Sequence, residues 1–351
     1  MYIIIAILLF GFLIATHELG HFLAAKMFNV KVEEFSIGMG PALFKKKGKE
    51  TLYALRVLPI GGYCAMNEDD GESADARAFV NQKWWKRAII LAAGTLMNFL
   101  TGFLILLCIV PSSDSYISPR VSEFFEGSPY QGEEQLMEGD TFYKIDGHRV
   151  FFSSNVGMLL SRGNDDLHDI VILRDGEKIE YEDFRLSTVE YNLEGETVQK
   201  YGFIFAVEEQ GFWEGIRNTW YSTIDFVRMV WFGLADIVSG AVGLSDLSGP
   251  VGIVQLINNV GEVSETTSAA LYSIAYLCAF IAVNLAVMNM LPVPALDGGR
   301  ILLLIVTVIV EGITKKKLDP KYEAYIHTGG LVLLLGLMLV VMVSDITRLF
   351  S

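Results

Sequence analysis

Residues 2–27 read YIIIAILLFGFLIATHELGHFLAAKM, an apolar run that closes on two histidines and a glutamate. Residues 1–16 contain no charged side chain. The run is long enough for a membrane-spanning helix, which needs about 20 residues. It has neither a basic start nor a small-x-small cleavage site, so a secretory signal is not indicated. The sequence predicts a retained transmembrane helix at 2–27.

The motif at the end of this run carries the chemistry. His17 and His21 are four positions apart, so on a helix their imidazoles point the same way and can share one zinc ion. Glu18 is placed to handle the proton of a water at that ion. Chance is the alternative explanation, but ionisable side chains at membrane depth cost about 2.5 to 3.5 kcal/mol each and mark functional sites. The motif therefore predicts a zinc hydrolase of the bilayer.

The composition agrees with a membrane protein. Of the 351 residues, 52% are hydrophobic and 19% are charged, below the roughly 25% charged residues of soluble domains. The net charge of −14 does not suggest nucleic-acid binding. The three cysteines show no CxxC spacing, so neither a disulfide framework nor a cysteine zinc site is indicated.

Three further spans are expected after the first. They lie at 88–110, 269–291 and 329–343, and the last needs its flanks to reach the usual length. The shorter apolar stretch 301–310 is expected to continue the third helix or to lie half-buried beneath it.

The distribution of charge predicts the orientation. Residues 26–87 contain 11 Lys and Arg and residues 300–327 contain 5, whereas 111–267 contains 27 Asp and Glu against 10 Lys and Arg. Short loops rich in Lys and Arg stay in the cytoplasm. We therefore expect a multi-pass protein of the bacterial plasma membrane with both termini and the acidic central segment outside.

The segment 111–210 is expected to form a small β-rich domain. Alternating stretches in it are separated by glycine-containing turns. The expected strands are 141–145, 169–174 and 178–184, and the expected turns are Asp146-Gly147 and Asp175-Gly176.

This segment resembles a PDZ domain through residues 138–147, EGDTFYKIDG. The peptide-binding loop that the resemblance implies near 119–125 is degenerate. Three roles stay open for the domain: it binds C-terminal peptides, it excludes bulky substrates, or it is a spacer. After it, apolar and charged residues interleave over 212–244, which predicts an amphipathic helix followed by a linker to residue 267.

Residues 30–66 alternate like strands and are broken by glycines. They predict a β-hairpin that dips into the membrane interface. Such a hairpin can offer an edge strand to an unwound substrate. A cytoplasmic hairpin without substrate contact is the alternative.

A second motif spans 284–299, NLAVMNMLPVPALDGG. Pro292, Pro294 and the glycine pair break the third helix, so Asp297 can turn toward the metal. Two histidines and one carboxylate, with water in the open position, form a standard catalytic zinc set. A helix-capping aspartate is the alternative.

Together these motifs resemble the site-2 protease family of intramembrane zinc metalloproteases, of the type that regulates sigma factor E. Thr95 and Arg300 depart mildly from the pattern, and one PDZ-like insert is present rather than two. Further matching stretches are FSIGMGP at 35–41, LPIGGY at 58–63, AGTLMNF at 93–99 and SGPVG at 248–252.

The resemblance implies particular roles for single residues. By it, His17, His21 and Asp297 bind Zn²⁺, Glu18 is the general base, and Asn284 contacts the substrate strand. Further expected substrate contacts are Gly61, Gly62 and Pro294.

The resemblance also implies regulated intramembrane proteolysis in the lipid bilayer. The expected substrates are single-span membrane proteins, namely anti-sigma factors or signal-peptide remnants, and no nucleic acid is involved. The expected fold is a polytopic α-helical membrane protein with four transmembrane helices, a membrane-associated β-hairpin region and one extracytoplasmic PDZ-like domain. The parts are 1–110, 111–210, 211–267 and 268–351. A non-catalytic PDZ scaffold is the alternative, whereas a transporter has little support without internal repeats.

Overall fold

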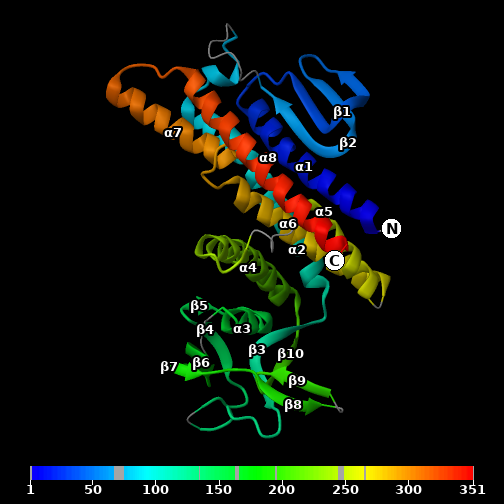
Figure 1. Cartoon of the computed structure of the whole chain (residues 1–351), viewed down its shortest axis with the longest axis vertical. Coiled ribbons are helices and arrows are strands. Elements are labelled where there is room, and N and C mark those ends of the chain that lie inside the picture. Colours follow the sequence, from blue (N-terminus) through cyan, green and yellow to red (C-terminus); the bar gives the residue numbers. More distant parts are fainter. Residues whose placement is uncertain are drawn as a thin grey trace. The chain divides into compact units, whose positions relative to one another are not determined.

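The computed structural model describes residues 2–66, 75–133, 135–162, 166–193, 196–243, 249–264 and 266–350. Leu244 and Ser248, which belong to two of the stretches singled out in the sequence, lie outside these ranges. The chain forms two compact units (Figure 1). One comprises Met1–Ile109 with Phe226–Ser351, and the other comprises Val110–Asp225.

Among the described residues, the first unit contains four helices that are long and apolar enough to cross a membrane, as the sequence predicted. The fourth extends far beyond the predicted 329–343, because its polar and aromatic flanks continue the helical backbone. Within the unit α2 packs against both α1 and α6. The four helices are α1 (Tyr2–Met27), α2 (Trp84–Ile109), α6 (Thr267–Asn289) and α8 (Pro320–Phe350).

The stretch 301–310 does not continue the third span, so the first of the two alternatives for it is wrong. It belongs to a separate helix, α7 (Asp297–Thr314). The break lies at residues 290–296, where two prolines cannot sit inside a helix and Ala295 adopts a φ of 76°. Asp297 is therefore the first residue of α7 and follows the break that the sequence predicted at Pro292 and Pro294.

The β-region of this unit is more folded than the predicted hairpin. It consists of β1 (Glu34–Lys47) and β2 (Leu52–Ala65). Ile37 pairs with Leu55 in the parallel register and also with Gly62. Residues 34–37 therefore lie between two arms of β2. The arm at 62–65 forms one outer edge of this sheet, and β2 packs against α1.

Arg56 ties these arms together. Its guanidinium donates hydrogen bonds to Ser36 Oγ at 2.7 Å, to the Gly40 carbonyl at 2.7 Å, and to Glu34 Oε1 and Tyr63 Oη at 2.6 Å each. Partial burial raises the pKa of Glu34, but hydrogen bonds from Arg56 and Tyr63 hold that pKa below its usual value.

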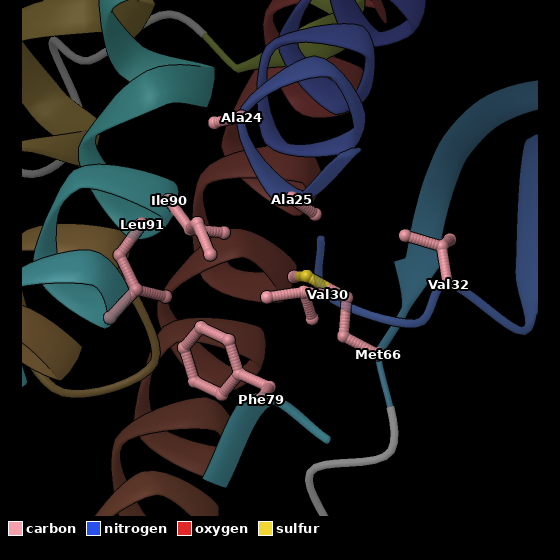
Figure 2. Close-up of a cluster of buried hydrophobic side chains, with 8 residues drawn as sticks. All are labelled: Ala24, Ala25, Val30, Val32, Met66, Phe79, Ile90 and Leu91. Carbon is pink, nitrogen blue, oxygen red and sulfur yellow. The ribbon is translucent and has the colours of Figure 1, made fainter. Parts of the chain in front are cut away.

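A buried apolar cluster joins the end of α1, the β-region and the start of α2 (Figure 2). It includes Phe79 from the short 3₁₀ helix η1 (Phe79–Asn81), whose ring lies below Ile90 and Leu91 of α2. Close packing here fixes the β-region against the two helices. The cluster comprises Ala24, Ala25, Val30, Val32, Met66, Phe79, Ile90 and Leu91.

The second unit is a β-rich module built on one antiparallel sheet. The strand order is β10-β3-β4-β6-β7, and β5 pairs with β4. A separate hairpin, β8-β9, lies between β7 and β10 in sequence. The elements are η2 (Val110–Ser112), β3 (Ser115–Phe124), β4 (Thr141–Ile145), β5 (His148–Arg149), α3 (Ser153–Leu160), β6 (Leu167–Arg174), β7 (Glu177–Arg185), β8 (Val189–Leu193), β9 (Glu196–Lys200) and β10 (Phe203–Glu209).

Two predictions for this unit have different outcomes. The turns at Asp146-Gly147 and Asp175-Gly176 are confirmed, and all four residues have positive φ values, as tight hairpin turns require. The loop expected near 119–125 is wrong. Residues 119–124 belong to β3, which pairs with β10 through Val121, Glu123 and Phe124 and with β4 at Arg120.

Two helices connect this module to the third span. The first, α4 (Phe212–Ser239), matches the predicted amphipathic helix and exposes Trp213 and Trp220 while burying Asn218 and Thr219. The second, α5 (Pro250–Val263), was not expected from the sequence and packs against α1, α6 and α8.

A buried carboxylate fixes the start of α5. Asp345 of α8 is 2% exposed and accepts hydrogen bonds from the backbone N–H groups of Gly249 at 3.2 Å and Gly252 at 2.9 Å. A negative charge at a helix N-terminus satisfies free N–H groups and favours the helix dipole.

Replacing Asp345 with Ala is expected to lower the free energy of unfolding by about 1–3 kcal/mol, because two buried N–H groups lose their acceptor. Thermal unfolding of the purified protein in detergent measures this. Asp345→Asn keeps one acceptor oxygen and should lose less. Wild-type melting of Asp345→Ala would show that the cap contributes nothing.

Candidate metal centre

Three side chains from two helices converge inside the first unit. His17 and His21 come from α1, and Asp297 comes from α7. The Nε2 atoms of the two histidines are 3.2 Å apart, and they lie 3.2 and 3.5 Å from Asp297 Oδ2. A tetrahedral zinc site with bonds of about 2.0–2.1 Å has ligand atoms roughly 3.3–3.4 Å apart. The donor set and its spacing therefore fit zinc.

Helix α2 supports two of these ligands. The Nδ1–H group of His21 donates to the Ile90 carbonyl at 2.8 Å, which leaves Nε2 directed at the other ligand atoms. Thr95, which is 5% exposed, donates through its hydroxyl to Asp297 Oδ2 at 3.5 Å. Partners of this kind fix the orientation of ligands in metal sites.

Two glycines allow α1 and α2 to approach this closely. A Cβ atom on Gly20 would lie 2.3 Å from the Ala93 carbonyl oxygen, and one on Gly94 would lie 2.3 Å from His21 Nε2. No side chain fits at either position without displacement of backbone or of a ligand. The helix contact and the position of His21 therefore depend on each other.

The turn before α7 positions Asp297. Gly298 and Gly299 pack against the carbonyl groups of Met290 and Val293, where a Cβ atom would come within 2.1 and 2.0 Å of the oxygens. The backbone N–H of Ala295 donates to His327 Nδ1 of α8 at 3.3 Å. The turn thus packs against the first residues of α7 and is hydrogen-bonded to α8. It presents the Asp297 carboxylate toward α1.

The ligands face a cavity of about 390 Å³. Glu18 also lines it, and the backbone N–H of Cys64 in β2 donates a hydrogen bond to the Glu18 carboxylate. A Cβ atom on Gly62 would lie 3.1 Å from Glu18 Cγ. The outer arm of β2 therefore runs directly beside the acid. The remaining lining residues are His17, His21, Tyr63, Met66, Leu91, Asn289, Ala295, Leu296, Asp297 and Arg300.

The expected substrate-contacting residues lie at different places. Gly62 is beside Glu18, Gly61 lies against Met39, and Pro294 lies against Gly330. Asn284 is half-buried on α6 and is not among the residues that line the cavity.

Sequence reasoning assigned no role to Asn289, which lines the cavity, or to Thr95. The sequence did contain a pattern that could have indicated Thr95. Thr95, Asn98 and Thr101 are three positions apart in the stretch 88–109 of α2, which is otherwise apolar, and all three are buried. Polar residues on one face of a membrane helix mark a functional or packing face.

The sequence model of peptidase family M50 matches residues 5–337. The chain belongs to peptidase family M50. This family contains the site-2 proteases, so the predicted resemblance is confirmed. Among the relatives of this M50 chain, a Clostridium perfringens protein named as a zinc metalloprotease is 35% identical over 99% of this chain and 98% of its own length. The regulator of sigma-W protease RasP of Bacillus subtilis is 26% identical, with 99% of each chain covered.

These matches extend over nearly the full length of both chains. The M50 protein is therefore a zinc metalloprotease and a multi-pass membrane protein, rather than a non-catalytic scaffold. The cluster of His17, His21 and Asp297 is the group of potential metal ligands among the residues that the structure describes.

Replacing Gly94 with Ala in this M50 protease is expected to remove most of the bound zinc, because the new methyl group displaces the imidazole of His21. Metal analysis of the purified protein measures the zinc content per chain. Gly336→Ala in α8 is the matched control, since no atom lies within 4 Å of a Cβ there. Full zinc occupancy in Gly94→Ala would contradict the tight contact.

Proposed function

We propose that this protease cleaves peptide bonds within the transmembrane segments of single-span membrane proteins, with anti-sigma factors or signal-peptide remnants as substrates. One observation carries the proposal. A zinc-type ligand set lies in a helix bundle directly beside the outer arm of a β-sheet, at Gly62 and Cys64. This arrangement suits an enzyme whose substrate must leave the helical state before it is cut.

We assign the roles of the polar groups as follows. His17, His21 and Asp297 hold the metal. Bound zinc supplies a Lewis acid for the scissile carbonyl and acidifies the attacking water. Glu18 accepts the proton of that water and delivers it to the amide nitrogen that leaves. The Cys64 N–H orients the Glu18 carboxylate for both transfers.

The substrate segment is proposed to bind as an extended strand. A peptide bond in a transmembrane helix is shielded by its own hydrogen bonds, so the helix must unwind locally before hydrolysis. Within the described residues no other strand pairs with the outer side of 62–65. An extended segment can pair there, with Gly61 and Gly62 allowing close approach. Asn289 also lines the cavity and is available to the substrate backbone, and Asn284 and Pro294 are proposed to act farther along the substrate.

The name of one relative supports the substrate class. The Bacillus subtilis protein is named as a regulator of sigma-W protease. A protease that regulates a sigma factor acts on a protein that restrains it. This supports a membrane-anchored anti-sigma factor as the substrate here.

Measuring zinc content together with cleavage is expected to distinguish the proposed base from the proposed ligands. Glu18→Gln should reduce cleavage of a trimmed single-span substrate by about 10²–10⁴-fold, because the base is lost. Its zinc content should stay near one per chain. Asp297→Ala and His21→Ala should lose zinc as well as activity, because each removes a ligand.

Two results would contradict these roles. Near wild-type cleavage by Glu18→Gln would show that another group takes the proton. Full zinc occupancy in Asp297→Ala would show that the third ligand lies elsewhere.

We further propose that the enzyme lies in the bacterial plasma membrane with both termini and the PDZ-like unit outside, since the Lys- and Arg-rich segments 26–87 and 300–327 stay in the cytoplasm. A reporter that is active only after export should work when fused within the turn at Gly176 and after the last residue. The same reporter at Gly48 should be inactive. The reverse pattern would overturn the orientation.

A further inference from the structure

One buried polar side chain near the ligands has no role in the proposed mechanism. Asn98 of α2 is 1% exposed and faces α1. Its Oδ1 lies 3.3 Å from Thr16 Oγ1, and its Nδ2 lies 3.5 Å from His17 Nδ1. A buried amide in an apolar bundle is costly unless both of its ends are hydrogen-bonded. Both ends of the Asn98 amide thus contact α1, and one of them contacts the proposed ligand His17.

The protons available decide which end of the amide faces which partner. The oxygen and nitrogen of an amide cannot be told apart from heavy-atom positions, so the hydrogen-bond network must assign them. Thr16 has one hydroxyl proton, and its Oγ1 lies 2.9 Å from the Leu13 carbonyl oxygen, which can only accept. With that proton used, Thr16 Oγ1 accepts from Asn98. The amide nitrogen therefore faces Thr16.

The imidazole gives the same answer independently. To bind a metal through Nε2, a neutral His17 must carry its proton on Nδ1. An Nδ1–H group needs an acceptor, and the amide atom 3.5 Å away must then be the oxygen. The two requirements agree on one orientation of Asn98, with its oxygen toward His17 and its nitrogen toward Thr16.

We propose that Asn98 is a positioning residue that fixes the tautomer of His17 for zinc binding. His17 Nδ1–H donates to the Asn98 oxygen, the Asn98 amide donates to Thr16 Oγ1, and the Thr16 hydroxyl donates to the Leu13 carbonyl. This relay leaves His17 Nε2 without a proton and directed at Asp297 and His21. The inference rests on the proposed function in one respect, namely that His17 binds zinc.

The two histidines are then oriented by the same helix in different ways. His21 depends on the Ile90 backbone carbonyl, which no substitution removes. His17 depends on a side chain two turns farther along α2. Zinc binding should therefore be sensitive to the residue at position 98, and the effect should act through His17 alone.

Zinc affinity of the purified full-length protein, measured by competition with a chelator, tests the relay. Asn98→Leu removes both hydrogen-bonding ends at similar volume and should weaken zinc binding by about 10–100-fold. Asn98→Asp keeps an acceptor for His17 Nδ1–H, and its second oxygen can accept the Thr16 hydroxyl proton. It should stay within about threefold of the wild type, since supporting carboxylates serve metal-binding histidines well.

One matched control and one graded variant lie on the same two helices. Thr101→Val removes a buried hydroxyl that donates to the Met97 carbonyl at 2.8 Å, and it should leave zinc affinity unchanged. Thr16→Val removes only the far end of the relay. It should weaken zinc binding by a few-fold, in the same direction as Asn98→Leu but less.

A second measurement reads the tautomer directly. In ¹⁵N-histidine NMR spectra of the zinc-free protein, with His17 assigned by comparison with His17→Ala, the wild type should show the proton on Nδ1. Asn98→Leu should move His17 toward the Nε2–H form and leave His21 unchanged. A wild-type tautomer and zinc affinity in Asn98→Leu would overturn the inference, as would Asn98→Asp losing as much affinity as Asn98→Leu. If His17→Ala itself keeps zinc, it is the proposed ligand set that fails.

Discussion

Two imidazoles and two carboxylates have to meet inside an apolar helix bundle, where each unsatisfied polar group costs several kcal/mol. This requirement governs the rest of the first unit. The candidate ligands come from α1 and α7, and α2 lies against both helices and provides hydrogen-bond partners for His21 and Asp297. A central helix that is apolar in composition thus carries polar groups on the one face that needs them.

Close backbone packing follows from the same requirement. The ligand atoms lie 3.2 to 3.5 Å apart, so the helices that carry them cannot be separated by side chains of ordinary size. Gly20 and Gly94 permit the contact between α1 and α2, and the turn at 290–296 brings Asp297 back toward them. The proline-induced break between α6 and α7 is therefore part of the site and not only the end of a span.

The β-region gives this rigid site an extended partner. Arg56 and the buried cluster around Phe79 hold the sheet against α1 and α2, so the arm at 62–65 stays beside Glu18. A strand edge can be offered at membrane depth only where its free N–H and C=O groups line a cavity. The cavity beside Glu18 meets that condition, and in the proposed function it brings an unwound substrate next to the proposed base.

The sequence by itself determined the features that depend on local spacing. The four spans follow from apolar length, the candidate metal-binding pair from the four-residue period of a helix, and the hairpin turns of the second unit from Asp-Gly pairs with positive φ. Tertiary structure alone decided the features that depend on distant segments. These are the separate helix α7, the doubled pairing of residues 34–37, the inclusion of 119–124 in β3, and the contact of Thr95 with Asp297 across 202 positions. The physical reason is that periodicity reports which face of an element is apolar, whereas only packing determines which element that face meets.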